Sequence, residues 1–311
     1  MDPQLYGLLL YGISIITMGG IYSVLALGLN MHWGLTGILN IGIAGFFGIG
    51  AYTSAILASK PDPNRFGGFE LPLSITFPIA MIMSAIIAYI VAKICIRLRP
   101  DYLAIATIGI AEILRLIAKN QENLTGGTFG INVSRPFQDL AGPWNHVTFM
   151  CLVLAFVLIV YLLCERARLS PWGRVMRALR DNEDAARALG KNIDHFRTVA
   201  FVAGASFMGL AGALSCHYIK YIGPTSIEPL QATFLVWVML IVGGAGSNKG
   251  AIFGAMIIWL IWSASELFAW NLPSELAIRA AFIRVFIIGF VLVFMLQYFE
   301  KGVFGPRKGE N

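Results

Sequence analysis

Long apolar stretches constrain this chain more than any other feature of its sequence. A helix needs about 20 mostly apolar residues to cross roughly 30 Å of hydrocarbon, and nine stretches of the chain are near that length. They are Leu5–Leu29, Ile38–Ala58, Pro72–Ile94, Tyr102–Ala118, Val147–Cys164, Thr198–Ile219, Leu230–Gly246, Ala251–Trp270 and Ala277–Phe299. The pattern predicts an all-α fold, a polytopic transmembrane helical bundle of about eight or nine spans, some of them broken or re-entrant.

The composition agrees with a lipid environment and argues against several other classes of protein. Apolar residues make up 57% of the 311 residues and charged residues only 13%, whereas soluble domains carry about 25% charged residues. The net charge of +6 comes from Lys and Arg residues divided among the predicted loops, which argues against nucleic-acid binding. The four cysteines have no metal-ligand spacing, so we expect no metal site. We expect residues 1–311 to form a single transmembrane domain.

The distribution of basic residues predicts the orientation of the bundle. If the N-terminus lies outside and the chain crosses nine times, fifteen Lys and Arg residues fall in cytoplasmic segments and five in external ones. The opposite orientation would contradict the rule that cytoplasmic loops are richer in basic residues. The sequence therefore predicts an external N-terminus and a cytoplasmic C-terminus.

The longest charged stretch, residues 165–197, lies on the predicted cytoplasmic side and has the sequence signals of two short helices. Ser170 can cap the first helix, and Pro171 suits its first position. Asn182 can cap the second helix, acidic residues follow in its first turn, and Gly190 suits its end. We therefore expect a folded cytoplasmic element.

The second of these helices has the composition of a docking surface. The run Asp184–Gly190 places Ala185 beside Ala186, and small side chains let a partner approach closely. The flanking residues Arg177, Arg180 and Arg187 can fix the register of such a partner by charge, and Trp172 is expected to be an exposed aromatic residue nearby. The alternative is a solvated linker that only follows the positive-inside rule. The capping signals and Trp172 favour docking.

The same run resembles the EAA-type cytoplasmic motif of ABC importer permeases, with Asp184 in place of the usual Glu. In that family this loop is a coupling element seated in a groove of the ATPase subunit, so residues 165–197 would form a cytoplasmic coupling loop. Either Glu183 or Asp184 would carry the acidic contact. The residues that the resemblance implies for ATPase coupling are Arg177, Glu183, Asp184, Ala185, Ala186 and Gly190.

Four blocks of the chain, in the same order, resemble the LivM-type permeases of branched-chain amino acid importers. They are Gly28–Leu57, Tyr102–Arg115, Ser170–Gly190 and Phe234–Gly250, and the similarity extends from about Ser23 to Pro306. The resemblance implies a permease subunit of the bacterial inner (plasma) membrane that carries branched-chain or other neutral amino acids. Urea or short amides are the alternative substrates. The implied partners are a second, LivH-type permease, two cytoplasmic ATPase subunits that bind ATP and Mg, and a periplasmic substrate-binding protein.

One segment, Met31–Gly37, has the composition of a broken helix within the membrane. It carries polar residues and two glycines between apolar runs, and backbone groups freed at membrane depth must face protein or a wet cavity. Polar side chains beside such breaks are candidate contacts for a substrate. We expect the substrate pathway to include Asn30, Thr36, Asn40 and Thr107.

A charged pair lies inside the fourth apolar stretch. Arg115 follows Glu112 by three positions, so the two side chains share a helical face and can pair. An ionisable residue at such depth is a functional candidate by default, and Glu112 is therefore also a candidate for the substrate pathway. The alternative is a structural ion pair between helices or subunits.

Two other classes of membrane protein fit the sequence less well. A secondary transporter would show internal repeats and ion-coupling residues near the midplane, and we find no clear repeat between the halves. A membrane enzyme would need a nucleophile and base or a metal set, and the four histidines fall at different segment ends. Gly243–Gly246 followed by Lys249 lacks the spacing of a phosphate-binding loop. We expect no enzymatic activity and no cofactor in this chain.

Overall fold

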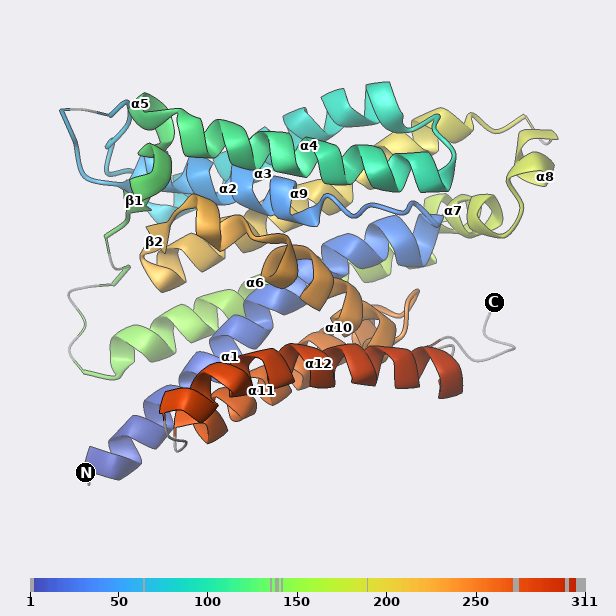
Figure 1. Cartoon of the computed structure of the whole chain (residues 1–311). Coiled ribbons are helices and arrows are strands. Elements are labelled where there is room, and N and C mark those ends of the chain that lie inside the picture. Colours follow the sequence, from blue (N-terminus) through green and yellow to red (C-terminus); the bar gives the residue numbers. More distant parts are fainter. Residues whose placement is uncertain are drawn as a thin grey trace.

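The chain folds almost entirely into helices that run between two ends of an elongated bundle (Figure 1). The computed structural model describes residues 3–63, 65–134, 136–137, 140, 142–188, 190–270, 274–299 and 302–305. The long helices are α1 (Pro3–Leu29), α3 (Leu73–Cys95), α4 (Pro100–Asn120), α6 (Trp144–Leu169), α9 (Ile193–Ile219), α11 (Asn248–Trp270) and α12 (Ser274–Tyr298). The shorter ones are α2 (Ile43–Ala58), α5 (Glu122–Thr125), α7 (Pro171–Asp181), α8 (Glu183–Ala188) and α10 (Leu235–Gly243).

Irregular helical segments and one small hairpin complete the fold. Asn30–Leu35 continues α1 as a π-helix, and Leu230–Phe234 leads into α10 in the same conformation. Short 3-10 turns cover Gly127–Phe129 and Pro224–Ile227. Strands β1 (Ile131–Asn132) and β2 (Tyr221–Ile222) pair antiparallel, with Ile131 opposite Ile222.

Each of the nine predicted apolar stretches contains a helix, which confirms the all-α polytopic fold. Six helical stretches in the described residues are long and apolar enough to cross a membrane: Gln4–Leu35, Leu73–Cys95, Trp144–Leu169, Ile193–Ile219, Pro224–Gly243 and Asn248–Leu267. The apolar helices Ile43–Ala58 and Phe282–Tyr298 are shorter. Helix α4 has the length of a span but carries four charged residues, Asp101, Glu112, Arg115 and Lys119.

The bundle has two groups of helices with α1 crossing between them. Helices α2, α3, α4 and α9 form one group, and α10, α11 and α12 lie on the other side of α1 (Figure 1). Helix α9 is the centre, because it contacts α1, α2 and α3, and every residue from Phe207 to His217 is buried. The outward faces of α3, α6 and α12 carry large exposed apolar side chains, as expected of surfaces in contact with lipid.

Glycines let α2 and α9 approach each other at backbone distance. A β-carbon on Gly50 would overlap the carbonyl oxygen of Gly209, and one on Gly212 would overlap the carbonyl oxygen of Phe47. Membrane helices lack a hydrophobic drive to associate within lipid, so close backbone packing of this kind supplies much of their attraction. The α2–α9 contact therefore depends on the absence of side chains at Gly50 and Gly212.

Different elements lie at the two ends of the bundle. Helix α1 begins at the end that carries α5 and the hairpin, whereas α12 finishes at the end that carries α7 and α8 (Figure 1). The charged stretch 165–197 is more helical than expected, because α6 continues to Leu169 and α9 already begins at Ile193. The loop between these two helices is therefore α7, α8 and their connections.

Adding a methyl group at the α2–α9 contact should destabilise the fold. We expect Gly212→Ala to lower the free energy of unfolding by about 1–3 kcal/mol, the usual cost of overpacking, because its β-carbon meets the Phe47 carbonyl. The matched control is Gly12→Ala in α1, where no atom lies within 4 Å of the added carbon. Thermal unfolding in detergent checks this. Equal melting temperatures for the two variants would contradict the packing argument.

Candidate functional site

The first candidate site is the helical element formed by α7 and α8, which follows from the capping signals of the sequence. Ser170 Oγ accepts a hydrogen bond from the backbone N–H of Gly173 at 3.2 Å, and Pro171 occupies the first turn of α7. Arg177 Nη1 donates to the carbonyl oxygen of Arg168 at 3.0 Å, which fastens α7 to the end of α6. The predicted caps at Ser170 and Pro171 are confirmed.

The side chains of Trp172 and Ala186 pack against the chain itself, whereas both were expected at the surface. The ring of Trp172 is half-buried against the core and is not an exposed aromatic group. Ala186 is 4% exposed and packs in a small apolar cluster with Met176, Leu179 and Ile193. The face of each helix is set by packing against α6 and α9, so Ala186 serves this chain's own core.

Ion pairs hold α8 against α9. Glu183 accepts from Arg197 Nη2 at 2.8 Å and from Arg187 Nη2 at 3.1 Å. Asp184 is exposed and forms no ion pair with any residue that the structure describes. Gly190 takes φ = +73°, which ends the element in a conformation that glycine adopts without strain. The side chain of Ala185 lies outside the described part of the structure.

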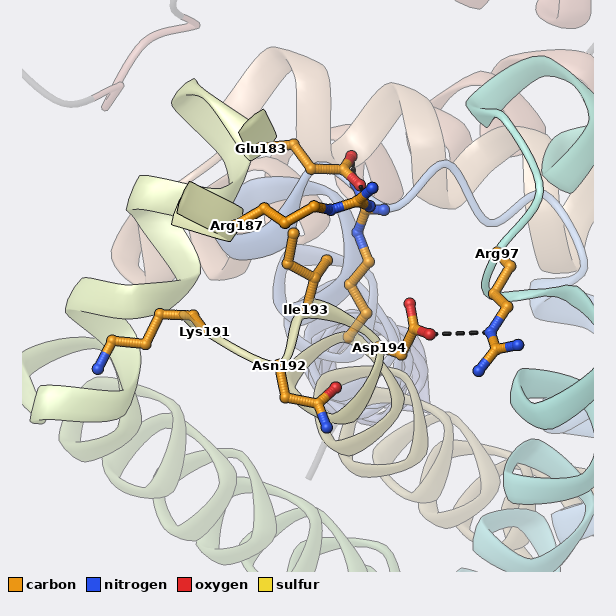
Figure 2. A pocket seen from close by; sticks show the side chains of 8 residues that line it. Arg97, Glu183, Arg187, Lys191, Asn192, Ile193 and Asp194 are labelled. Atoms are coloured by element: carbon orange, nitrogen blue, oxygen red, sulfur yellow. Dashed lines mark hydrogen bonds and ion pairs between the residues drawn. The ribbon is translucent and has the colours of Figure 1, made fainter. Parts of the chain in front are cut away.

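A basic pocket of about 430 Å³ opens beside α8 (Figure 2). Its lining includes the Glu183 cluster and a second ion pair, in which Arg97 Nε donates to Asp194 Oδ2 at 2.8 Å. Figure 2 shows the Glu183 and Arg187 side chains meeting on one side of the pocket, with Arg97 and Asp194 on the other. Four basic and two acidic residues line it, so it carries an excess of positive charge.

The second candidate site is the break between α1 and α2. The carbonyl oxygen of Phe201 can only accept, so the ring of His32 donates to it from Nε2 at 2.8 Å. The other nitrogen, Nδ1, therefore accepts from Asn40 Nδ2 at 3.1 Å. Thr36 Oγ1 donates to the carbonyl oxygen of His32. The ring also stacks on Phe201, with 4.7 Å between the ring centroids.

Two threonines from other helical segments, together with Asn40 of the break itself, pair with backbone N–H groups of residues 41–44. Thr107 Oγ1 accepts from the N–H of Ile41 at 3.1 Å, and Asn40 Oδ1 accepts from the N–H of Gly42 at 2.9 Å. Thr233 Oγ1 accepts from the N–H of Ala44 at 3.2 Å. Freed backbone groups inside a membrane protein need partners of this kind. The break was predicted at Met31–Gly37, but Met31–Leu35 is π-helical and the non-helical residues are 37–42, at the end of the predicted segment.

The four polar candidates near the break are buried in these contacts. Asn30 and Asn40 are 0% exposed, and Thr36 and Thr107 are 1% exposed. Asn30 Nδ2 donates to Asn248 Oδ1 at 2.8 Å, while Asn30 Oδ1 accepts from the N–H of Gly246. In this conformation the side chains hold the break together. Asn248 and Thr233 belong to the same network and were not predicted.

Glu112 and Arg115 pair as predicted, but they face outward. Their closest atoms, Arg115 Nη2 and Glu112 Oε1, are 2.6 Å apart, and the two side chains are 27% and 41% exposed respectively. Neighbouring positions on the same helical face, including Ile105 and Ile108, are exposed apolar residues. Glu112 is therefore separate from the break, which Thr107 contacts from the buried face of α4.

Among the described residues, no group of three or more His, Cys, Asp or Glu side chains is placed to hold a metal ion. The polar groups at the break are amides, hydroxyls and one imidazole, each engaged in hydrogen bonds within the chain. The arrangement is therefore suited to fixing a backbone and, at α7 and α8, to presenting charged groups.

Comparison with known proteins identifies a family for this architecture. A family model described as "Branched-chain amino acid transport system / permease component" matches residues 11–296. The chain is 33% identical to the high-affinity branched-chain amino acid transport permease LivM of Salmonella typhimurium over 270 residues, which are 79% of this chain and 61% of that protein. It is 27% identical over 321 residues to a probable LivM of Methanocaldococcus jannaschii, covering 93% and 91%. It is also 25% identical over 265 residues to the permease LivH of Salmonella typhimurium, covering 81% and 84%.

Replacing Asn40 should separate a structural role from contact with a substrate. We expect Asn40→Ala to destabilise the chain by about 1–3 kcal/mol, because it leaves the buried His32 Nδ1 and the N–H of Gly42 without partners. Asn120→Ala, at an exposed amide that donates to Leu116, is the matched control. Thermal unfolding in detergent measures both. An Asn40→Ala chain as stable as the control would instead favour a direct role with substrate.

Proposed function

The chain belongs to the permease-component family of branched-chain amino acid transport systems, and from this premise we propose that it is a permease subunit of an ATP-driven importer. It forms half of the translocation pathway for branched-chain or other neutral amino acids. The chain covers 61% of the length of the Salmonella LivM protein. The match to the M. jannaschii protein over nearly the whole of both chains supports the same role.

The observation that carries the pathway role is the exposed ion pair on α4. Glu112 lies twelve residues from the start of this helix, or about 18 Å at a rise of 1.5 Å per residue. Charged side chains at such depth face a bundle interior or a water-filled cavity, because hydrocarbon does not solvate them. In the single chain this face is exposed. We therefore infer that this face of α4 contacts the partner permease or lines the aqueous pathway between the two subunits.

Coupling to ATP hydrolysis is assigned to α7 and α8. Glu183 is occupied by Arg187 and Arg197, whereas Asp184 points its charge to the surface. This difference favours Asp184 over Glu183 as the acidic contact with an ATPase. The positive pocket beside α8 offers a complementary surface for acidic groups of the same partner.

The orientation and the remaining subunits follow from the same proposal. The end that carries α7, α8 and the finish of α12 faces the cytoplasm, and α1 begins on the external side. Two cytoplasmic ATPases bind ATP and Mg, and a periplasmic binding protein delivers the substrate. The similarity to both LivM and LivH supports a pair of non-identical permeases. This chain contributes no ATPase site and no cofactor.

Neutralising Asp184 should impair transport while leaving the fold intact. In the assembled importer we expect Asp184→Ala to reduce ATP-dependent leucine uptake by roughly tenfold, equivalent to about 1.4 kcal/mol of interface energy. Asp184 is exposed, so the melting temperature of the purified chain should not change. Glu183→Ala is the matched comparison, and it should lower that melting temperature because Arg197 loses its partner. Normal uptake by Asp184→Ala would refute the coupling assignment.

Replacing both charges on α4 tests the pathway face. If this face met lipid, Glu112→Leu with Arg115→Leu would be harmless or stabilising, because buried pairs replaced by apolar groups are often tolerated. We expect the double variant to fold normally but to lose roughly tenfold in leucine uptake, a change worth about 1.4 kcal/mol. Ile117→Leu, at another exposed position of α4, is the control. Uptake in membrane vesicles decides between these outcomes, and uptake equal to the control would place the pair against lipid.

A further inference from the structure

Helix α7 is connected to the break in α1 by a direct hydrogen bond. Arg180 Nη1 donates to the carbonyl oxygen of Gly34 at 2.5 Å, although the two residues are 146 positions apart. The aliphatic part of the same side chain packs over Gly37, where an added β-carbon would lie 3.3 Å from Arg180 Cγ. The end of α7 therefore contacts the π-helical segment through the guanidinium of Arg180 and contacts Gly37, just after that segment, through its aliphatic part.

A second route joins the same two elements through α6 and α11. Asn30 in the π-helical segment donates to Asn248 Oδ1 at 2.8 Å, and Asn248 Nδ2 donates to Glu165 Oε2 at 2.8 Å. Glu165 also pairs with Arg168, whose backbone carbonyl accepts from Arg177 of α7. The hydrogen bonds thus form a closed ring from α7 to the π-helical segment, to α11, to α6 and back to α7.

The ring leaves little freedom at its centre. Asn30 is 0% exposed and Asn248 is 2% exposed. A β-carbon on Gly34 would overlap Asn30 Oδ1, which accepts from the N–H of Gly246. Buried polar groups that are fully paired fix one arrangement, because any partial opening leaves an unpaired group in a low-dielectric environment. The Asn30–Asn248 part of the ring therefore resists opening, and a displacement of α7 that keeps the bond between Arg180 and Gly34 moves the π-helical segment with it.

We propose that Arg180 and Asn248 are positioning residues of a mechanical link that transmits movement of α7 to the break in α1. The proposal rests on the proposed function, in which α7 and α8 contact an ATPase. The π-helical segment continues into residues 37–42, which Thr107 fastens to α4. Movement of α7 thereby reaches the helix that carries the Glu112–Arg115 face. Arg180 connects α7 directly to Gly34 by a hydrogen bond. Asn248 connects α6 and α11 to the same π-helical segment, so that these helices move together with it.

The test uses the complete importer reconstituted in liposomes with its ATPases and binding protein. The quantity measured is leucine taken up per ATP hydrolysed. We expect Arg180→Ala to keep ATP hydrolysis but lower this ratio by roughly two- to thirty-fold, the range seen for mutations within coupling networks. Arg180→Lys should recover part of it, because an ammonium group can also donate to the Gly34 carbonyl. Arg166→Ala, at an exposed arginine of α6 outside the ring, is the control.

Asn248→Ala provides a second, independent break in the ring. We expect it to lower the ratio in the same direction, and the double variant Arg180→Ala with Asn248→Ala to lose less than the product of the two single effects. An unchanged ratio in Arg180→Ala, or equal losses of uptake and hydrolysis, would overturn the link. If the unaltered complex shows no ATP-dependent uptake at all, the proposed function itself fails.

Discussion

The backbone of residues 36–42 leaves its helix inside an apolar protein, and the surrounding structure supplies the hydrogen bonds that it loses. The ring of His32 accepts from Asn40 and donates to the carbonyl of Phe201 on α9, and the hydroxyl of Thr36 donates to the carbonyl of His32. Thr107 on α4 and Thr233 before α10 take up further N–H groups. Lipid offers no substitute for these partners. The fold must therefore place α4, α9 and the segment before α10 next to the break. The positions of these elements are set by a few polar contacts within a large apolar protein.

Packing divides the molecule into parts of different stiffness. In the first group, α2 and α9 touch at backbone level through Gly50, Gly209 and Gly212, and such contacts do not deform gradually. In the second group, a turn at residues 303–304 packs against the end of α10, where the N–H of Val303 donates to the Val242 carbonyl at 3.0 Å. Helix α1 contacts both groups. Its non-helical break is thus the place where a change at the cytoplasmic end can reach the middle of the bundle.

Much of the fold could be predicted from the sequence because it depends on local chemistry. Apolar length identified the helices, and Ser170 with Pro171 identified the start of α7. The glycines and polar residues of Met31–Gly37 indicated a break, which the structure places at residues 37–42, at the end of that segment. The direction of side chains was harder to predict. Trp172 and Ala186 face the chain's own core, because contacts with α6 and α9 set the rotation of short helices.

For the candidate sites too, the sequence indicated which residues matter but not which partners their side chains contact. Asn30, Thr36, Asn40 and Thr107 were identified as polar residues near a break, but one sequence does not reveal that they are already paired within the chain. Asn248 was missed because its partner Asn30 lies 218 positions away. Arg180 was expected to fix the register of a docking partner, but it binds Gly34 of this chain, 146 positions away. A polar residue directly after the glycine turn at Gly244–Ser247 was the available signal for Asn248. No comparable local signal pointed to the contact between Arg180 and Gly34.

The dependence of α2 on α9 has a consequence for biosynthesis. Helix α2 has only 16 residues, or about 24 Å at helical rise, and its close partners Gly209 and Gly212 are encoded roughly 160 residues later. At about 5–20 residues per second the ribosome needs roughly 10–30 s to supply them. During that interval the short helix and the polar segment before it wait in the membrane or the insertion machinery without their native neighbours. Completion of α9, more than insertion of α2, is the step that commits the N-terminal third of the chain to its final structure.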